Sequence, residues 1–241
     1  MTDKNTFDIL LLIARPAAGK SEIIDYLKNT PVEERRERFH IGEFVEIDDF
    51  PMLWTWFEED ALLEQMGHPR LHTDAQRLFL NQYLWDLLIE RIGLEYQKKV
   101  RDIPGYEERY TTIVEFSRGA EHGGYRSAFG HLLPEMLPKM AVLYIEVTWE
   151  ESLRKNRQRF NPEKPDSILE HGISDWKMER LYREVDWNEV SSGDPHYLSI
   201  QGTRVPYVVF DNADDVTTGR GAALGERLEQ SLKELWALYK R

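Results

Sequence analysis

The 241-residue sequence contains no cysteine. Disulfide bonds and thiolate metal ligands are therefore excluded, and the reducing cytoplasm is the expected location. No apolar run approaches the length of a membrane span, and the polar N-terminus "MTDKNTF" does not resemble a signal peptide. We therefore expect a soluble protein that has no membrane partner.

The sequence is also short of positive charge, with 31 lysine and arginine residues against 43 aspartate and glutamate residues and a net charge of −12. This balance disfavours general attraction to nucleic acid or to an anionic membrane. An anionic ligand would have to be bound by a local basic cluster. The length suits one α/β domain over residues 1–241, with insertions.

The stretch "ARPAAGKS" (residues 14–21) departs from the phosphate-binding pattern GxxxxGK[ST] only at its first position, where Ala14 replaces glycine. Gly19 permits a tight turn that points successive N–H groups into one hollow, at the positive N-terminal end of the following helix. Lys20 would reach the outer phosphates, and the Ser21 hydroxyl would ligate Mg²⁺. The expected nucleotide-binding residues here are Arg15, Pro16, Ala17, Ala18, Gly19, Lys20 and Ser21. The alternative is an ordinary strand-to-helix turn.

Apolar runs and helical patterns alternate along the chain. The runs predict strands over residues 8–14, 39–47, 111–116, 141–147 and 205–210. The segments between them predict helices, including a long buried helix over 74–100 and a closing helix near 224–239. This alternation predicts an α/β fold with a parallel sheet covered on both faces. The charged, proline-containing stretch within residues 154–186 predicts an insertion beyond the sheet.

Acidic residues follow two of the predicted strands. Asp48 and Asp49 come after the second strand, where a carboxylate can meet a substrate hydroxyl or Mg²⁺. Asp49 also precedes Pro51 by two residues, so it can instead cap a helix. Glu115 and Arg118 come where the third strand ends. Glu115 can hold Mg²⁺ or orient the attacking hydroxyl, and Arg118 can grip a phosphate; the alternative is an exposed Glu–Arg pair.

The segment "LRKNRQR" after the fourth strand is basic. Arg154 and Arg157 are three residues apart, hence on one helical face, and Arg159 extends the cluster. Such a cluster can stabilise phosphate charge, although Glu150 lies four residues before Arg154, as in a solvated helix with ion pairs. After the fifth strand, Asn212 could edge an adenine, with a plain turn as the alternative.

Together these motifs resemble the P-loop kinase family of nucleoside and nucleotide kinases, within the P-loop nucleoside triphosphate hydrolase superfamily. "EIDDF" looks like the acidic motif of uridine and nicotinamide riboside kinases. "VEFSRG" is similar to the Glu-Arg-Ser region of deoxynucleoside kinases, with Phe116 and Ser117 inserted before Arg118. "LRKNRQR" looks like their arginine-bearing lid. The resemblance implies a five-stranded parallel sheet in the order 2-3-1-4-5, a mobile lid, and transfer of the γ-phosphoryl group of ATP.

We therefore expect an ATP- and Mg²⁺-dependent kinase for a small acceptor, with a nucleoside or nucleotide favoured. In the implied strand order Glu115 joins Ser21 near Mg²⁺, and Asp48 meets the acceptor hydroxyl. A P-loop hydrolase is the rival enzyme, but no NKxD-type motif is found, and "DIPG" follows a charged segment rather than a strand. A non-catalytic nucleotide-binding regulatory protein is the other rival. The oligomeric state is open, with a homodimer among the alternatives.

Overall fold

The computed structural model describes residues 4–159 and 173–241, and within them one sheet has six strands in the order β2-β3-β1-β4-β6-β5. The strands are β1 (Ile9–Ala14), β2 (Glu43–Asp48), β3 (Tyr110–Phe116), β4 (Met140–Glu146), β5 (Tyr197–Ile200) and β6 (Thr203–Asp211). β5 pairs antiparallel with β6, and the other pairings are parallel. The α/β class and the mostly parallel sheet are therefore confirmed.

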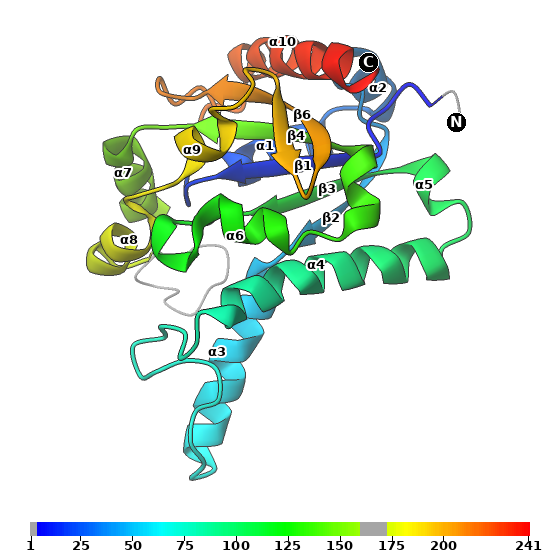
Figure 1. The fold of residues 1–241 in the computed structure, drawn as a ribbon. Helices are drawn as coiled ribbons and strands as arrows, with labels where there is room; N and C mark the ends of the chain where they lie inside the picture. The colour runs from blue at the N-terminus through cyan, green and yellow to red at the C-terminus, as the bar shows by residue number, and fades with distance from the viewer. Residues whose placement is uncertain (1–3, 160–172) are drawn as a thin grey trace.

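Helices cover both faces of this sheet (Figure 1). They are α1 (Lys20–Asn29), α2 (Val32–Phe39), α3 (Phe50–Gln65), α4 (Tyr83–Asp102), α5 (Tyr106–Arg109), η1 (Ala120–His122), α6 (Gly124–Gly130), η2 (Pro134–Lys139), α7 (Trp149–Arg159), α8 (Asp175–Tyr182), α9 (Trp187–Ser191) and α10 (Ala222–Tyr239). None of these described helices has both the length and the apolar character needed to cross a bilayer.

The central strand β1 is buried on both faces, as its continuous apolar run predicts. Ile9, Leu11 and Ile13 pack into a core that includes residues of α4 and α6. Leu10 and Leu12 point the other way, into a core with residues of α1 and α10. Because β1 lies between β3 and β4, the loop that follows it emerges at the middle of the sheet's carboxyl edge.

The expectation of five strands was wrong by one, because β5 adds an antiparallel edge beyond the five parallel strands. β5 has only four residues, and its sequence "YLSI" carries little periodic signal. It is joined to β6 by Gln201 and Gly202, which have φ angles of 49° and 77°. Two successive left-handed residues match the twist of a tight hairpin. Gln-Gly is not the usual residue pair for such a turn, so the hairpin went unpredicted.

Two further boundaries differ from the prediction. Phe39 is the last residue of α2 rather than the start of a strand, and the left-handed His40 ends that helix. The expected helix over 74–100 begins only at Tyr83. The Asp74 carboxylate accepts hydrogen bonds from the backbone N–H groups of Gln76 and Leu78, at 2.8 and 2.9 Å. Such local bonds compete with helix formation, so this segment forms a turn.

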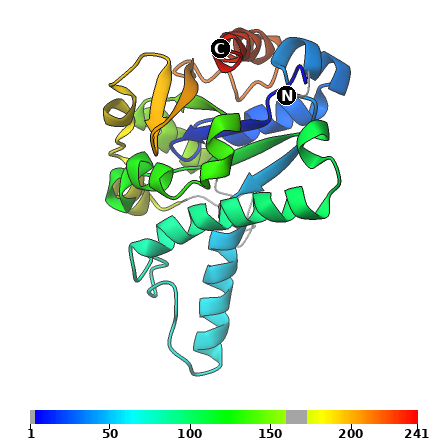
Figure 2. The ribbon, with the colours of Figure 1, turned by 45° about the vertical axis from the view of Figure 1, so that its right-hand side comes forward.

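The α3 helix projects away from the sheet, and the following segment returns along it to α4 (Figure 2). Its base packs in a small separate cluster that includes Trp56, Trp85 and Leu88. We call residues 50–82 the arm.

Candidate functional site

The phosphate loop (residues 14–21) joins the end of β1 to the start of α1. Ala17 and Gly19 both have left-handed backbones, with φ angles of 57° and 113°. A Cβ atom on residue 19 would lie 2.6 Å from Thr217 Oγ1, so only glycine fits there. Within the described residues, the backbone N–H groups of residues 17–22 donate no hydrogen bond, and the helical bonds resume with Ile23 N–H to the Gly19 carbonyl. Free N–H groups at a helix N-terminus form an anion-binding hollow.

Contacts from distant parts of the chain hold this loop in place. The Ser152 hydroxyl donates to the Pro16 carbonyl at 2.8 Å. The Asn212 amide donates to the Ala18 carbonyl at 2.9 Å and to Thr217 Oγ1 at 2.8 Å. Asn212 is fully buried, so its side chain supports the loop instead of presenting an edge to a base.

Arg15, which the sequence placed among the nucleotide-binding residues, also bonds to the protein backbone. Its guanidinium donates to the carbonyls of Val147, Tyr182 and Arg183 at 3.1–3.2 Å. These bonds tie the start of the phosphate loop to the segment that follows α8.

Lys20 points toward the end of β3. Its Nζ donates to Ser117 Oγ at 2.7 Å. Burial lowers the pKa of Lys20, and the negative charges of Glu115 and Asp48 oppose that shift. The lysine therefore lies between the phosphate loop and the acidic side chains, as the phosphate-binding pattern requires.

Asp48 and Glu115 are aligned at the carboxyl ends of β2 and β3. Burial, together with the charges of Glu115 and Asp49, raises the pKa of Asp48 to about 8. Burial also raises the pKa of Glu115, against the opposing charge of Lys20. Among the residues that the structure describes, none donates a hydrogen bond to the Glu115 carboxylate. Two half-buried carboxylates facing one lysine form a site that attracts further positive charge.

Asp49 and Arg118 form a buried ion pair with each other. The sequence had suggested a substrate contact or a helix cap for Asp49 and a phosphate contact for Arg118. Arg118 is only 2% exposed, and its Nη1 donates to Asp49 Oδ2 at 2.6 Å. Arg118 Nη2 donates to the Trp85 carbonyl at 3.1 Å. The exposed Glu–Arg pair considered above is therefore wrong. Asp49 occupies the N-cap position of α3 without a capping side-chain bond. It is Asp48 that accepts a hydrogen bond, from Phe50 N–H at 2.9 Å.

Arg154 and Arg157 do not lie on the face of α7 that contacts the phosphate loop. Arg154 pairs with Glu151 and Asp215, and Arg157 pairs with Asp175. Both arginines are exposed in these ion pairs, as in the solvated-helix alternative.

The residues of α7 that do reach the loop region are Ser152, Lys155 and Arg159, spaced on one helical face. Arg159 Nη2 donates to Ser21 Oγ at 3.1 Å. Lys155 is buried, and its Nζ donates to Asp215 at 2.7 Å and to Thr217 Oγ1 at 3.0 Å. The sequence showed the basic cluster but not which of its faces is turned inward, and Lys155 was missed for that reason.

The insertion expected over residues 154–186 includes residues 160–172, which lie outside the described residues. On either side of them, α7 and α8 are bound together. Asn156 donates to the Ile173 carbonyl at 2.6 Å and accepts from Ile173 N–H at 3.0 Å. The two ends of the insertion therefore meet near the phosphate loop.

In the described parts of the chain, no three histidine, aspartate or glutamate side chains converge to hold a metal ion. Mg²⁺ usually needs only one or two protein oxygens, because phosphate oxygens and water complete its octahedron. The Ser21 hydroxyl and the Glu115 carboxylate are oxygen donors of this kind. Because no described residue donates a hydrogen bond to the Glu115 carboxylate, its oxygens are open to a cation, and these two residues fit the expected Mg²⁺ ion.

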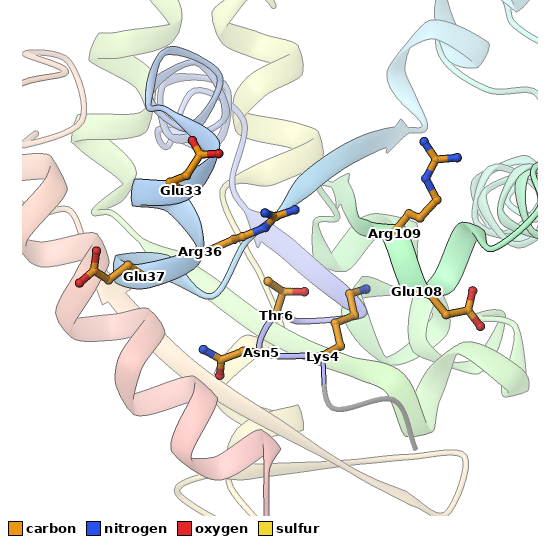
Figure 3. A pocket seen from close by; sticks show the side chains of 9 residues that line it. Lys4, Asn5, Thr6, Glu33, Arg36, Glu37, Glu108 and Arg109 are labelled. Carbon is orange, nitrogen blue, oxygen red and sulfur yellow. The ribbon is translucent and has the colours of Figure 1, made fainter.

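A hollow of about 410 Å³ lies at the other edge of the sheet, where the strands begin (Figure 3). It includes Lys4, Arg36, Glu37 and Arg109 in its lining. The Lys4 amino group already donates to the Glu107 and Tyr110 carbonyls at 2.7 and 2.6 Å. Ligands of open parallel sheets bind beyond the carboxyl ends of the strands, so the candidate site is at the phosphate loop.

No family model and no curated protein matches the sequence. A crystal structure of TT1252 from Thermus thermophilus is similar to this chain, with 15% identity over 95% of this chain and 96% of that one and a TM-score of 0.44. A likeness at this level carries no argument about function.

Proposed function

We propose that the protein is an ATP- and Mg²⁺-dependent phosphotransferase for a small hydroxyl- or phosphate-bearing acceptor, with a nucleoside or nucleotide favoured. The observation that supports this proposal is the position of Lys20, between the free N–H groups of the phosphate loop and the aligned carboxylates of Asp48 and Glu115. An ordinary strand-to-helix turn has no need of a half-buried lysine beside two half-buried acids.

Each part of the site has a role in phosphoryl transfer. The loop N–H groups and Lys20 bind the phosphates and neutralise the charge that spreads over the transferred group. Mg²⁺, held by Ser21 and Glu115, supplies further charge neutralisation when bound. Arg159 donates a hydrogen bond to Ser21, so it is the α7 arginine best placed to bind the phosphates together with Lys20.

Asp48 accepts the proton of the acceptor hydroxyl. The acceptor oxygen bonds to the γ-phosphorus, and the bond from that phosphorus to the bridging oxygen breaks, so that ADP leaves with the electron pair. In its ionised form, a carboxylate with a pKa of about 8 is a stronger base than an ordinary aspartate. The lid predicted over residues 154–186 would exclude water, which otherwise competes as acceptor.

The experiment is to measure ATP consumption by the purified protein with and without a panel of nucleosides, nucleotides and small alcohols. Consumption that depends on one acceptor supports the kinase. Equal hydrolysis without any acceptor would instead show a nucleotide hydrolase. Tight ATP binding with no turnover would show a regulatory nucleotide-binding protein.

A further inference from the structure

Exposed apolar side chains are concentrated on the arm and on α4. Among the described residues, ten large apolar side chains are exposed, and eight of them lie between residues 62 and 100. We call these eight the apolar face: Leu62, Met66, Leu71, Leu80, Tyr83, Leu87, Leu94 and Val100. Exposed apolar residues scattered singly are ordinary, but such a concentration marks an interaction surface.

On the arm, hydrogen bonds to a buried carboxylate fix the backbone that carries the exposed Leu71. The buried Asp60 carboxylate accepts hydrogen bonds from the backbone N–H groups of Leu71, His72 and Thr73 and from the Thr73 hydroxyl, at 2.6–3.3 Å. Trp56 stacks on the His72 ring. Leu71 is therefore fixed in an exposed position by its own backbone bond, rather than exposed by a loose loop.

The α4 helix is apolar on two opposite sides. Leu88 and Ile92 are buried, Leu88 at the base of the arm and Ile92 in the core beneath the sheet. Tyr83, Leu87 and Leu94 lie on the outer side and are 62%, 41% and 41% exposed. Both ribbon views show α4 running along the sheet, with α3 crossing it and projecting away from the sheet (Figures 1 and 2). A helix that is apolar on both sides is typical of one buried between two partners.

We propose that a second copy of this chain covers the apolar face, with the two α4 helices antiparallel about a two-fold axis between residues 90 and 91. In this register Leu87 of one copy meets Leu94 of the other. Glu90 meets Arg91, and Tyr83 meets Lys98, so opposite charges and a cation–aromatic pair flank the leucines. Within one chain Arg91 pairs with Glu95 and Glu90 pairs with His131, and all four side chains remain at least 36% exposed, so they are accessible to the second copy.

The symmetry of the α4 stripe suits a dimer. Leu87 and Leu94 lie at equal distances in sequence from the proposed axis, and so do Tyr83 and Lys98. A self-complementary face is what a two-fold dimer requires. A membrane is a poor alternative occupant, because the chain has a net charge of −12 and Glu90 lies in the middle of the α4 stripe.

The test is the molar mass of the purified full chain, measured by light scattering and sedimentation across the micromolar range. The variants are Leu87→Glu, Leu94→Lys and the double variant. Val209→Glu is the matched control, because Val209 is an exposed apolar residue of β6, outside the face. Circular dichroism melting of each variant separates a lost interface from a lost fold, and the measurements need no nucleotide.

We expect a wild-type dimer, monomers for the two single variants, and an unchanged dimer for the control. The double variant should regain the dimer, because each new glutamate then faces a new lysine. A monomeric wild-type protein would overturn the proposal, and so would single variants that stay dimeric. A folded double variant that remains monomeric would overturn the antiparallel α4 pairing.

Discussion

Asp48 and Glu115 are aligned partners at the ends of two adjacent parallel strands. The positive charge of Lys20, in the phosphate loop, opposes the rise in the pKa of both acids. The register of β2 on β3 therefore brings together acids that are 67 positions apart in the sequence. Their raised pKa values reflect burial of negative charge that a single lysine does not balance. A bound cation or an acceptor hydroxyl would relieve that imbalance.

The two acids should be separable by mutation. Asp48→Asn should keep Mg²⁺-ATP affinity but lose about 10²-fold or more in turnover, the usual scale for a positioned general base. Glu115→Gln should weaken the Mg²⁺ dependence itself. Nucleotide titrations with and without Mg²⁺ check both. The assignment is wrong if Asp48→Asn abolishes Mg²⁺-ATP binding and Glu115→Gln leaves it intact.

Lys20→Ala should remove ATP-dependent transfer while the protein remains folded, because the one hydrogen bond of the Lys20 amino group to the described residues is to Ser117 Oγ, and its charge serves phosphate. Turnover and thermal melting, measured on the same preparation, check this. Lys28→Ala is the control, because Lys28 is an exposed lysine of the same helix that pairs with Glu46. Unchanged turnover in Lys20→Ala would contradict the phosphate-loop role.

Arg159→Ala should lower turnover more than Arg154→Ala or Arg157→Ala. Arg159 donates a hydrogen bond to Ser21, whereas the other two are held in solvent-exposed ion pairs, which contribute little. Steady-state kinetics of the three variants give the comparison. A larger loss in Arg157→Ala would show that α7 presents another face during turnover.

Arg118→Ala should destabilise the protein by about 3–5 kcal/mol, because it leaves Asp49 buried without its counter-charge. Urea unfolding measures the change. Arg126→Ala is the matched control, because its ion pair with Glu189 is exposed, and it should change stability by less than about 1 kcal/mol. Equal small effects in both variants would show that the buried pair is not needed.

Asp60→Asn should cost about 2 kcal/mol of stability, because its amide group would face backbone donors. Burial opposes ionisation of Asp60, but hydrogen bonds from Thr73, Leu71 and His72 outweigh it and hold its pKa below the usual value. The stabilisation is therefore complete above the ordinary aspartate pKa of about 3.9 and is lost as the pH falls through the lower folded pKa.

Denaturant unfolding at neutral and acidic pH checks this, with the exposed neighbour Glu59→Gln as control. The stability difference between wild type and Asp60→Asn should shrink as the pH is lowered. A difference that does not depend on pH would contradict the role of the charged carboxylate.

The sequence by itself determined the features that depend on a few neighbouring residues. Continuous apolar runs predicted the five parallel strands, and "ARPAAGKS" predicted the loop in which Gly19 is required by its backbone. Tertiary structure decided the features that depend on distant partners. It turned Lys155 and Arg159 inward on α7 rather than Arg154, and it buried Arg118 against Asp49, 69 positions away. Helical spacing shows which side chains share a face, but only packing selects the face that is buried.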